Sequence, residues 1–242
     1  MKCILLSAGL GKRLLPYTKN LPKCLIDLGG ENLIEIWLKK VNQLDFDEII
    51  INSHHLNDIL EHQIFKISEK LKIDNIKIIH EKELLGTAGT LWSLQKEIND
   101  DFFVINTDVY AEVDLKKMQQ TFQENFFDCL IAYDFRRDTY GCGIIKLSKN
   151  YFLEKFIEKD HNNKPGYVYS GILIFSKKIF EKLPFSKYSR NNFKGLDTGH
   201  HVLPQILKTT QGFEVSGKVI DLRDAQKLLE MREYYTNQIK LD

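Results

Sequence analysis

The first 135 residues alternate between short apolar runs and amphipathic segments, and this alternation limits the fold more than any other feature of the sequence. The apolar runs predict buried strands at 2–7, 47–54, 75–81, 101–109 and 128–135. The segments between them carry apolar residues at helical spacing and predict helices at 32–44, 56–71, 87–98 and 114–126. Strands and helices in strict alternation form βαβ units, so the sequence predicts a parallel sheet covered by helices.

The second half of the chain has a different pattern. Strand-like runs at 141–148, 152–159 and 167–176 follow one another with short connections, which is typical of antiparallel or mixed pairing. A short helix at 198–208, a late strand or hairpin at 213–222 and a terminal helix at 225–239 complete the prediction. We therefore expect an α/β protein with a Rossmann-like, doubly wound, mostly parallel central sheet, helices on both of its faces, and an added mixed or antiparallel half.

Composition and charge argue against several classes of protein. The formal net charge is +1 and the isoelectric point is near 7.7, which disfavours a general nucleic-acid-binding protein. No stretch approaches about 18 consecutive apolar residues, so we expect no membrane span and a cytoplasmic location. The four cysteines are widely spaced and form no CxxC pair, which favours reduced thiols over a disulfide framework or a metal site.

A glycine-rich loop follows the first predicted strand, in the stretch LLSAGLGKRLLPYTKNLPK. Doubly wound folds bind ligands at this carboxyl end of the strands. Gly9 and Gly11 fit the start of the dinucleotide fingerprint GxGxxG, but Leu14 occupies the third glycine position, which disfavours a dinucleotide-dependent oxidoreductase. The P-loop pattern also fails, because Arg13 follows Lys12 where that pattern requires Ser or Thr.

Three cations accompany these glycines: Lys12, Arg13 and, ten residues after Arg13, Lys23. A dinucleotide site neutralises two phosphates with backbone N–H groups and a helix end. A triphosphate carries about twice that charge, and its chemistry develops more charge in the transition state. Arg13 and Lys23 on one short loop answer that need, whereas a solvated basic face stays open as the alternative for Lys12.

The loop also resembles the signature G-x-G-x-R-L-x-P-x-T-x-x-x-P-K of the sugar-phosphate nucleotidyltransferases, the group of the glucose-1-phosphate thymidylyltransferases and the mannose- and heptose-phosphate guanylyltransferases. The match has no gap between Gly9 and Lys23. Later motifs of the family are matched in the same order by ELLGTAGTL (83–91), VINTDV (104–109), YGCGII (140–145), FIEKD (156–160), YSGILIFS (169–176) and VIDLRDAQKL (219–228).

This resemblance implies a reaction in which a sugar-1-phosphate oxygen attacks the α-phosphorus of a nucleoside triphosphate and pyrophosphate leaves. It implies an NTP and a sugar-1-phosphate as ligands and Mg²⁺ as the cofactor. From charge and hydropathy we expect no nucleic-acid or membrane partner, and a homo-oligomer stays open. Residues 1–242 would form a single nucleotidyltransferase domain, with a nucleotide-binding half over about 1–130 and an acceptor half over 131–242.

The resemblance also implies roles for individual residues. Arg13 would stabilise the leaving pyrophosphate by a bidentate grip, and Lys23 would lie against the α-phosphate. Asp108 and Asp221 would hold Mg²⁺, with a turn or helix cap as the alternative for Asp108. The nucleotide would contact Leu6, Ala8, Gly9, Gly11, Lys12, Glu81, Gly86 and Thr87. The sugar acceptor would contact Gly141, Glu158, Lys159, Ser170 and Gly171, with an exposed charge pair as the alternative for Glu158 and Lys159.

Glu81 favours GTP, because a carboxylate only accepts hydrogen bonds and guanine offers donors at N1 and N2. A mannose- or heptose-type acceptor is then favoured, while uridylyl, thymidylyl and cytidylyl transfer stay open. Three departures from the family pattern leave the acceptor open too: Thr107 replaces a glycine, Tyr169 replaces an asparagine, and Leu222 and Arg223 stand where the metal motif has I-G-T. A catalytically inactive homologue that binds nucleotide and regulates a partner is the second hypothesis.

Overall fold

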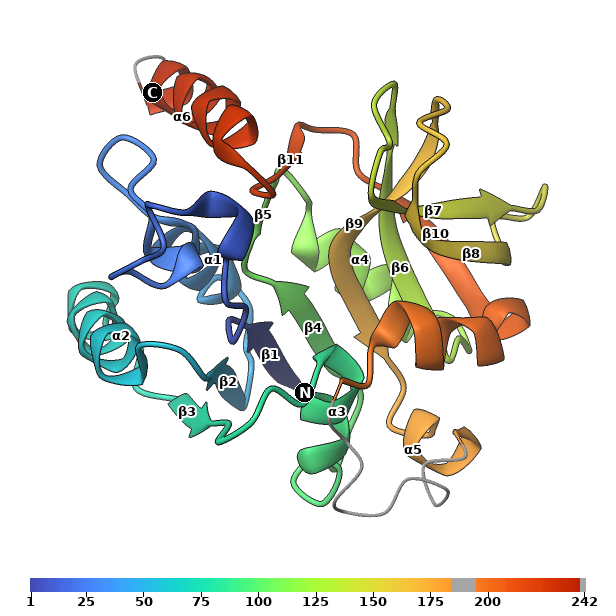
Figure 1. Cartoon of the computed structure of the whole chain (residues 1–242). Coiled ribbons are helices and arrows are strands. Elements are labelled where there is room, and N and C mark those ends of the chain that lie inside the picture. The colour runs from blue at the N-terminus through green and yellow to red at the C-terminus, as the bar shows by residue number, and fades with distance from the viewer. Residues whose placement is uncertain (184–194, 240–242) are drawn as a thin grey trace.

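The structure is a computed structural model, and it describes residues 1–183 and 195–239. Within these residues a nine-stranded mixed sheet runs through the molecule (Figure 1), and seven of its strands follow the order β10-β6-β9-β4-β1-β2-β3. Their bounds are Lys2–Leu6 (β1), Glu48–Ser53 (β2), Ile76–His80 (β3), Phe102–Asn106 (β4), Cys129–Arg136 (β6), Gly166–Phe175 (β9) and Thr210–Glu214 (β10). The antiparallel pair β7 (Cys142–Leu147) and β8 (Leu153–Asp160) extends the sheet from β9.

Strand direction separates the two halves of this sheet. β1 pairs in parallel with both β2 and β4, and β2 pairs in parallel with β3. β9 lies between β4 and β6 and is antiparallel to both, and β7 and β8 continue that antiparallel pairing. The last strand of the sheet, β10, returns beside β6 in parallel. The predicted α/β fold, a mostly parallel sheet with an antiparallel addition, is confirmed.

Helices cover both faces of the sheet because successive strand residues point to opposite sides. In β1, Cys3 and Leu5 belong to the core beneath α1, α2 and α4, whereas Ile4 belongs to the core beneath α3 and α5. The described helices are α1 (Leu33–Val41), α2 (Asn57–Leu71), α3 (Thr87–Ser93), α4 (Leu115–Gln123), α5 (Ile179–Lys182) and α6 (Ala225–Ile239). None of them, within 1–183 and 195–239, combines the length and apolarity needed to cross a bilayer.

The strand predicted at 101–109 is interrupted, and the interruption shapes the site. β4 ends at Asn106, Thr107 and Asp108 form a turn, and a separate short strand β5 (Val109–Ala111) begins after it. β5 leaves the main sheet and pairs antiparallel with β11 (Val219–Asp221). The segment predicted as one late strand or hairpin at 213–222 is likewise divided between β10 and β11. The division places Asp108, the residue before β5, next to Asp221, the last residue of β11.

The segment predicted as one short helix at 198–208 is helical but not continuous. The chain forms three short helical turns there instead, over Thr198–Val202, Leu203–Gln205 and Leu207–Thr209. Pro204 explains the difference, because proline has no N–H to donate and its ring clashes with the preceding turn of a continuous helix. The Asp197 side chain caps the first turn by accepting from the N–H groups of Gly199 and His200.

The C-terminal helix packs back on the first half of the chain. Leu228 and Met231 of α6 share a small hydrophobic core with Leu14 and Tyr110. Apolar residues of the loop after Leu14 and of α1 belong to the same core. Figure 1 shows α6 above α1, on the side away from β7 and β8. The two halves of the molecule are therefore not separated at one point in the sequence, since residues 219–239 return to the N-terminal side.

Trp37 is one of two residues of α1, with Lys40, that bond to carbonyl groups of β5. Its indole is fully buried, and Nε1 donates a hydrogen bond of 2.8 Å to the Val109 carbonyl. Trp37→Phe removes this donor and part of the buried volume, so we expect a loss of about 2–4 kcal/mol in the free energy of unfolding, measured by urea denaturation. Phe65→Leu, at an exposed position on α2, is the control and should change stability by less than about 0.5 kcal/mol. Equal stability of the two variants would contradict this anchoring role.

Candidate active site

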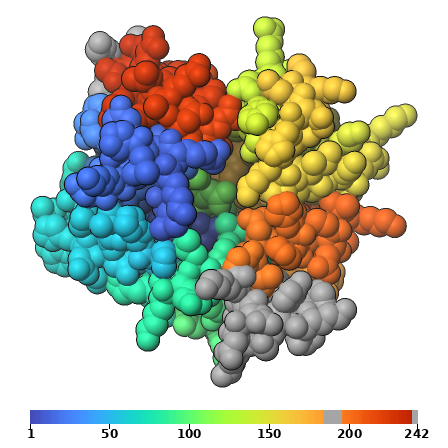
Figure 2. Space-filling model, in the orientation of Figure 1, coloured from blue at the N-terminus to red at the C-terminus, as the bar shows by residue number. Residues whose placement is uncertain are grey.

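Three adjoining cavities open at the carboxyl ends of β1, β2 and β4, and Asp108 borders all three. The strand-end cavity, of about 210 Å³, is bordered by Leu6, Ser7, Ala8, Gly9, Asn52, Glu81, Gly86, Thr87 and Thr107 among others. The hairpin cavity, of about 170 Å³, is bordered by Arg136, Gly141, Cys142, Glu158, Lys159, Tyr169, Gly171, Asp197 and Asp221 among others. The loop cavity, of about 150 Å³, is bordered by Gly9, Gly11, Lys12, Arg13, Leu14, Lys23 and Arg223. Figure 2 shows the surface hollowed between the blue N-terminal segment and the yellow and orange segments of the second half.

The cations of the glycine loop face this hollow in two ways. Lys23 is largely buried, and its Nζ lies 2.6 Å from Oδ2 of Asp108. Arg13 and Lys12 are exposed at the border of the loop cavity. Within the described part of the chain, no carboxylate pairs with Arg13. The loop therefore presents one cation already committed to Asp108 and at least one that is available to an incoming anion.

The two aspartates predicted as metal ligands are held together by strand pairing. Asp221 is opposite Val109 in the β5–β11 ladder, and the Leu222 N–H donates 2.8 Å to the Asp108 carbonyl. Burial and the negative charge of Asp108 raise the pKa of Asp221, and Lys23, Arg136 and Arg223 oppose that rise. Two neighbouring carboxylates repel each other when both are ionised, and a divalent cation between them would relieve that repulsion. They are therefore a suitable pair of oxygen ligands for such a cation.

A hard cation that keeps waters suits this pair better than a closed metal centre. Among the described residues, no group of three or more His, Cys, Asp or Glu side chains could hold a metal ion. Mg²⁺ needs fewer protein ligands, because it binds through one or two carboxylates together with phosphate oxygens and waters. Asp108 and Asp221 thus fit Mg²⁺ when a phosphate supplies the remaining oxygens.

A hydrogen-bond network centred on Asn52 forms the floor of the strand-end cavity. Its Oδ1 accepts from the Ser7 N–H at 2.6 Å, and its Nδ2 donates 2.8 Å to Oε1 of Glu81. Thr90 also donates to that oxygen, and Oε2 of Glu81 accepts from the Leu85 N–H at 3.2 Å. Glu81 is nearly buried and borders the cavity, yet both of its oxygens already serve the chain. Its proposed recognition of guanine would use the lone pairs that remain, and this stays a prediction.

Gly86 allows the start of α3 to lie against the segment that leads into Asp197. Its φ is +80°, and a Cβ there would lie 2.2 Å from the Leu196 carbonyl oxygen. That oxygen accepts from the N–H groups of Ala88 and Gly89, so two of the first amides of α3 are not available to a ligand. Thr87 borders both the strand-end and the hairpin cavities, and its hydroxyl accepts from the Thr198 N–H at 2.8 Å.

The hairpin cavity contains four of the five predicted acceptor residues, and Ser170 is the exception. Ser170 is fully buried, and its hydroxyl donates 2.7 Å to Asp134. Asp134 in turn holds Arg136 by two hydrogen bonds, 2.8 Å from Nε and 2.9 Å from Nη2. The direct acceptor contact predicted for Ser170 therefore needs correction: its side chain supports Arg136, which borders the cavity.

The structure shows which neighbours contact two of the residues that depart from the family pattern, Thr107 and Tyr169. Thr107 is buried without left-handed backbone, and its hydroxyl contacts Ser7 at 3.0 Å and the Leu6 carbonyl at 2.9 Å. A side chain is thus accommodated where the family has glycine. Tyr169 borders the hairpin cavity and packs edge-on against Phe156, so it narrows the space offered to an acceptor.

Sequence reasoning missed several residues that border the cavities. Asn52 and Asn106 lie at the ends of buried strands, where a polar residue after an apolar run is a usable signal. Arg136 also ends a strand, but its pairing with Asp134 could not be read from spacing alone. Asp197 is more than a hundred residues from Thr87, to which it is joined in the structure, and no local pattern marks it.

A family model described as nucleotidyl transferase matches residues 2–235. The bifunctional protein GlmU of Methanocaldococcus jannaschii is 27% identical over 243 residues, covering 100% of this chain and 56% of that protein. The D-glycero-alpha-D-manno-heptose 1-phosphate guanylyltransferase of Campylobacter jejuni is 28% identical over 202 residues, covering 81% and 88%. The chain spans about half the length of the first curated relatives that it matches.

Solved structures support the same fold. A crystal structure of a putative glucose-1-phosphate thymidylyltransferase from Bacillus anthracis, in complex with a sucrose, superposes with a TM-score of 0.84. The superposition covers 97% of this chain and 94% of that one at 21% sequence identity. At this identity the likeness concerns the architecture.

Glu158 should make stability depend on pH. Burial and the charge of Asp197 raise its pKa from 4.5 to about 7, and Lys159 opposes this. The unfolded chain loses the proton first, so the contribution of Glu158 to stability falls as pH rises from about 4.5 to about 7. Glu158→Gln removes the charge, and we expect Tm to be about 2 °C higher than wild type above pH 7, a modest gain because partial exposure screens the charge.

The measurement is thermal unfolding of both proteins between pH 4 and pH 8. The two should unfold at the same temperature near pH 4, where the carboxyl is protonated in both states. Glu154→Gln, on an exposed carboxylate of the same strand, is the control and should show no such divergence. A constant difference across the pH range would contradict the raised pKa of Glu158.

Proposed function

The chain belongs to the nucleotidyl transferase family, and from that premise we propose that it transfers a nucleoside monophosphate from an NTP to a sugar-1-phosphate and releases pyrophosphate. One observation carries the proposal: the strand-end, loop and hairpin cavities meet at Asp108. A nucleoside, a polyphosphate and an acceptor can then converge on one phosphorus atom. Such convergence supplies the positioning on which phosphoryl transfer depends.

The loop cavity suits the triphosphate. Among the described residues, Arg13 and Lys12 at its border have no ion-pair partner, and Arg13 can bind two phosphate oxygens in its planar fork. Lys23 lies deeper and is ion-paired with Asp108. From there its positive charge can stabilise the negative charge that develops on the α-phosphate and the leaving group. Gly9 places no side chain between the backbone and this ligand, because a Cβ there would point into open space.

The hairpin cavity suits the phosphorylated acceptor. Lys159 and the supported guanidinium of Arg136 supply positive charge for its phosphate. Glu158 and the hydroxyl of Tyr169 supply polar groups for sugar hydroxyls, as one expects of a polyol site. Asp108 and Asp221 would hold Mg²⁺ between the two ligands, where its charge would neutralise phosphate oxygens during transfer.

Within this reaction class we propose GTP as the donor and a mannose- or heptose-type 1-phosphate as the acceptor. The 28% identical Campylobacter guanylyltransferase supports this choice, as does the acceptor-only carboxylate of Glu81 at the strand-end cavity. We further propose a cytoplasmic protein in which residues 1–242 form one nucleotidyltransferase domain. Transfer of uridylyl, thymidylyl or cytidylyl groups remains the alternative that the substrate panel below separates.

The direct test is release of pyrophosphate from each of four NTPs with mannose 1-phosphate, glucose 1-phosphate or D-glycero-α-D-manno-heptose 1-phosphate and Mg²⁺. We expect the fastest release with GTP and little release once EDTA removes the metal. Arg13→Met should lower kcat on the order of 100-fold, because it removes a positive charge that stabilises the negative charge developing on the leaving pyrophosphate. Lys19→Met, on an exposed loop lysine that borders none of the three cavities, should match wild type. Tight GTP binding without turnover on any acceptor would instead favour the inactive regulatory homologue.

Gly9 and Gly11 provide a matched pair for the nucleotide site. A Cβ at Gly11, whose φ is +60°, would lie 2.7 Å from Cγ2 of Thr18, so Gly11→Ala should lower the free energy of unfolding by at least about 1 kcal/mol. Gly9→Ala meets no atom within 4 Å and should unfold like wild type. We nevertheless expect Gly9→Ala to weaken GTP binding about tenfold in calorimetry, because the methyl group would occupy ligand space. Wild-type affinity in Gly9→Ala would exclude close approach of the nucleotide at this residue.

A further inference from the structure

We propose that Arg223 is a positioning residue that ties the border of the hairpin cavity to the strand carrying Asp221, and thereby sets how well the acceptor is held. This inference rests on the proposed function, because it assigns the hairpin cavity to the acceptor. Arg223 stands where the family pattern has glycine. A large cation at that place is a property of this chain's own sequence.

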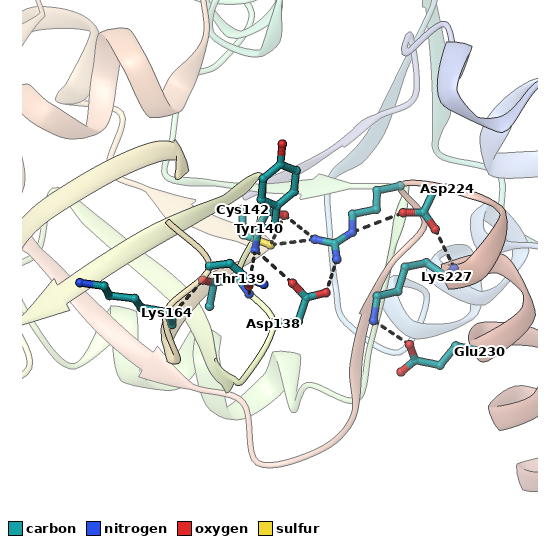
Figure 3. Close-up of polar contacts among 10 residues, drawn as sticks. Asp138, Thr139, Tyr140, Cys142, Lys164, Asp224, Lys227 and Glu230 are labelled. Carbon is teal, nitrogen blue, oxygen red and sulfur yellow. Dashed lines mark hydrogen bonds and ion pairs between the residues drawn. The ribbon is translucent and has the colours of Figure 1, made fainter. Parts of the chain in front are cut away.

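The guanidinium of Arg223 is committed to the loop that joins β6 to β7. Its Nη1 donates 2.6 Å to the Tyr140 carbonyl and lies 3.4 Å from Sγ of Cys142, and its Nη2 donates 2.5 Å to Asp138. Only 13% of the Arg223 side chain is exposed, whereas half of the Asp138 side chain is. Figure 3 shows these contacts converging from the loop onto one guanidinium, with Asp224 on its other side.

The loop that Arg223 holds, residues 138–142, borders the acceptor site. Gly141 and Cys142 both border the hairpin cavity. On its outer side the loop is fastened to the β8–β9 connection, since the N–H groups of Thr139 and Tyr140 donate to Asn163. Among the described residues, Arg223 is the side chain that bonds this loop to the proposed nucleotide side of the site. Without it the loop would be held from one side.

The other end of this tie is the metal-ligand strand itself. Arg223 follows Asp221 by two residues, and the intervening Leu222 is fully buried and donates its N–H to the Asp108 carbonyl. The backbone segment that positions the carboxylates of Asp108 and Asp221 therefore also positions the guanidinium of Arg223. Arg223 thus links the strand that carries Asp221 to the loop at 138–142, which forms another part of the hairpin cavity's border.

A direct phosphate contact is the rival explanation, because Arg223 also borders the loop cavity. Its charge argues against that role. Asp138 and Asp224 both lie within ion-pair distance, so the three groups together carry a net charge of −1. Arg13, with no such partners in the described chain, is the better ligand for a polyphosphate. Arg223 thus acts on the acceptor through the loop.

The test separates the two substrates of the reaction. In Arg223→Met, we expect kcat/KM for the acceptor to fall about tenfold, using the better of mannose 1-phosphate and D-glycero-α-D-manno-heptose 1-phosphate, while KM for GTP changes less than twofold. Arg223→Lys keeps a donor and should recover at least threefold of that loss. Arg137→Met, an exposed arginine beside Asp138 that borders none of the three site cavities, is the matched control and should match wild type.

A double-mutant cycle with Asp138→Asn tests whether the effect passes through the loop. We expect Asp138→Asn to lower acceptor kcat/KM several-fold in the wild type and less than twofold in Arg223→Met, since the contact is already lost. Additive losses, or a loss confined to GTP, would overturn the proposal in favour of direct phosphate binding. Equal losses for both substrates would point to a merely structural role and would overturn it as well.

Hydrogen exchange separates failure of this inference from failure of the proposed function. The Gly141 N–H donates to the Asp160 carbonyl and the Cys142 N–H to the Thr139 carbonyl, so both amides report on the loop. In Arg223→Met, peptides covering 138–142 should exchange at least tenfold faster, with peptides of α2 unchanged. Unchanged exchange in the loop would overturn the inference even if the enzyme is inactive. Inactivity of the wild type on every substrate, with faster exchange in the variant, would overturn only the proposed function.

Discussion

The ion pair between Lys23 and Asp108 is the interaction on which the arrangement of the site depends. It joins the glycine loop after β1 to the turn after β4, two adjacent parallel strands whose carboxyl ends meet. Asp221 lies beside this pair, and two carboxylates at one point repel each other unless positive charge is near. Lys23, Arg136 and Arg223 approach from three different elements and offset that repulsion. The site thus holds its acidic pair ready for a cation while remaining balanced without one.

Backbone pairing explains why the acidic pair forms at all. The main sheet stops at Asn106, and the chain turns through Thr107 and Asp108 before it pairs with β11. Trp37 and Lys40 of α1 bond to the carbonyls of Val109 and Ala111, so the diverted strand is fixed from the helix side. β9, antiparallel between β4 and β6, separates two strands that an uninterrupted doubly wound sheet would place together. The hairpin cavity is bordered by residues of β4, β6 and β9 and adjoins the strand-end cavity.

Much of this arrangement can be predicted from sequence, and the exceptions have physical causes. Period and alternation reveal the parallel strands, and the spacing from Gly9 to Lys23 reveals the loop, because both signals are local. The position of β9 in the sheet is decided by pairings between distant segments, which no local pattern encodes. Ser170 was expected to contact the acceptor, but a side chain that turns inward toward Asp134 cannot be told from one that turns outward by its neighbours in sequence. The prediction of one helix at 198–208 overlooked Pro204, although proline is a local signal for a break.

The departures from the family pattern are better understood as a connected set than as isolated losses. Thr107 fills its place with hydrogen bonds to Ser7 and Leu6, so the turn before Asp108 is stiffened rather than strained. Arg223 replaces a residue without a side chain by one that reaches the loop at Asp138, and Tyr169 occupies part of the cavity that this loop borders. Thr107 adds its contacts at the strand-end cavity, whereas Arg223 and Tyr169 add theirs around the hairpin cavity, and the pairing of Asp108 with Lys23 is intact. Arg13, by contrast, is exposed at the loop cavity and has no ion-pair partner among the described residues, so a role in packing does not explain it. Its position supports the proposed transferase with an altered acceptor over the inactive homologue.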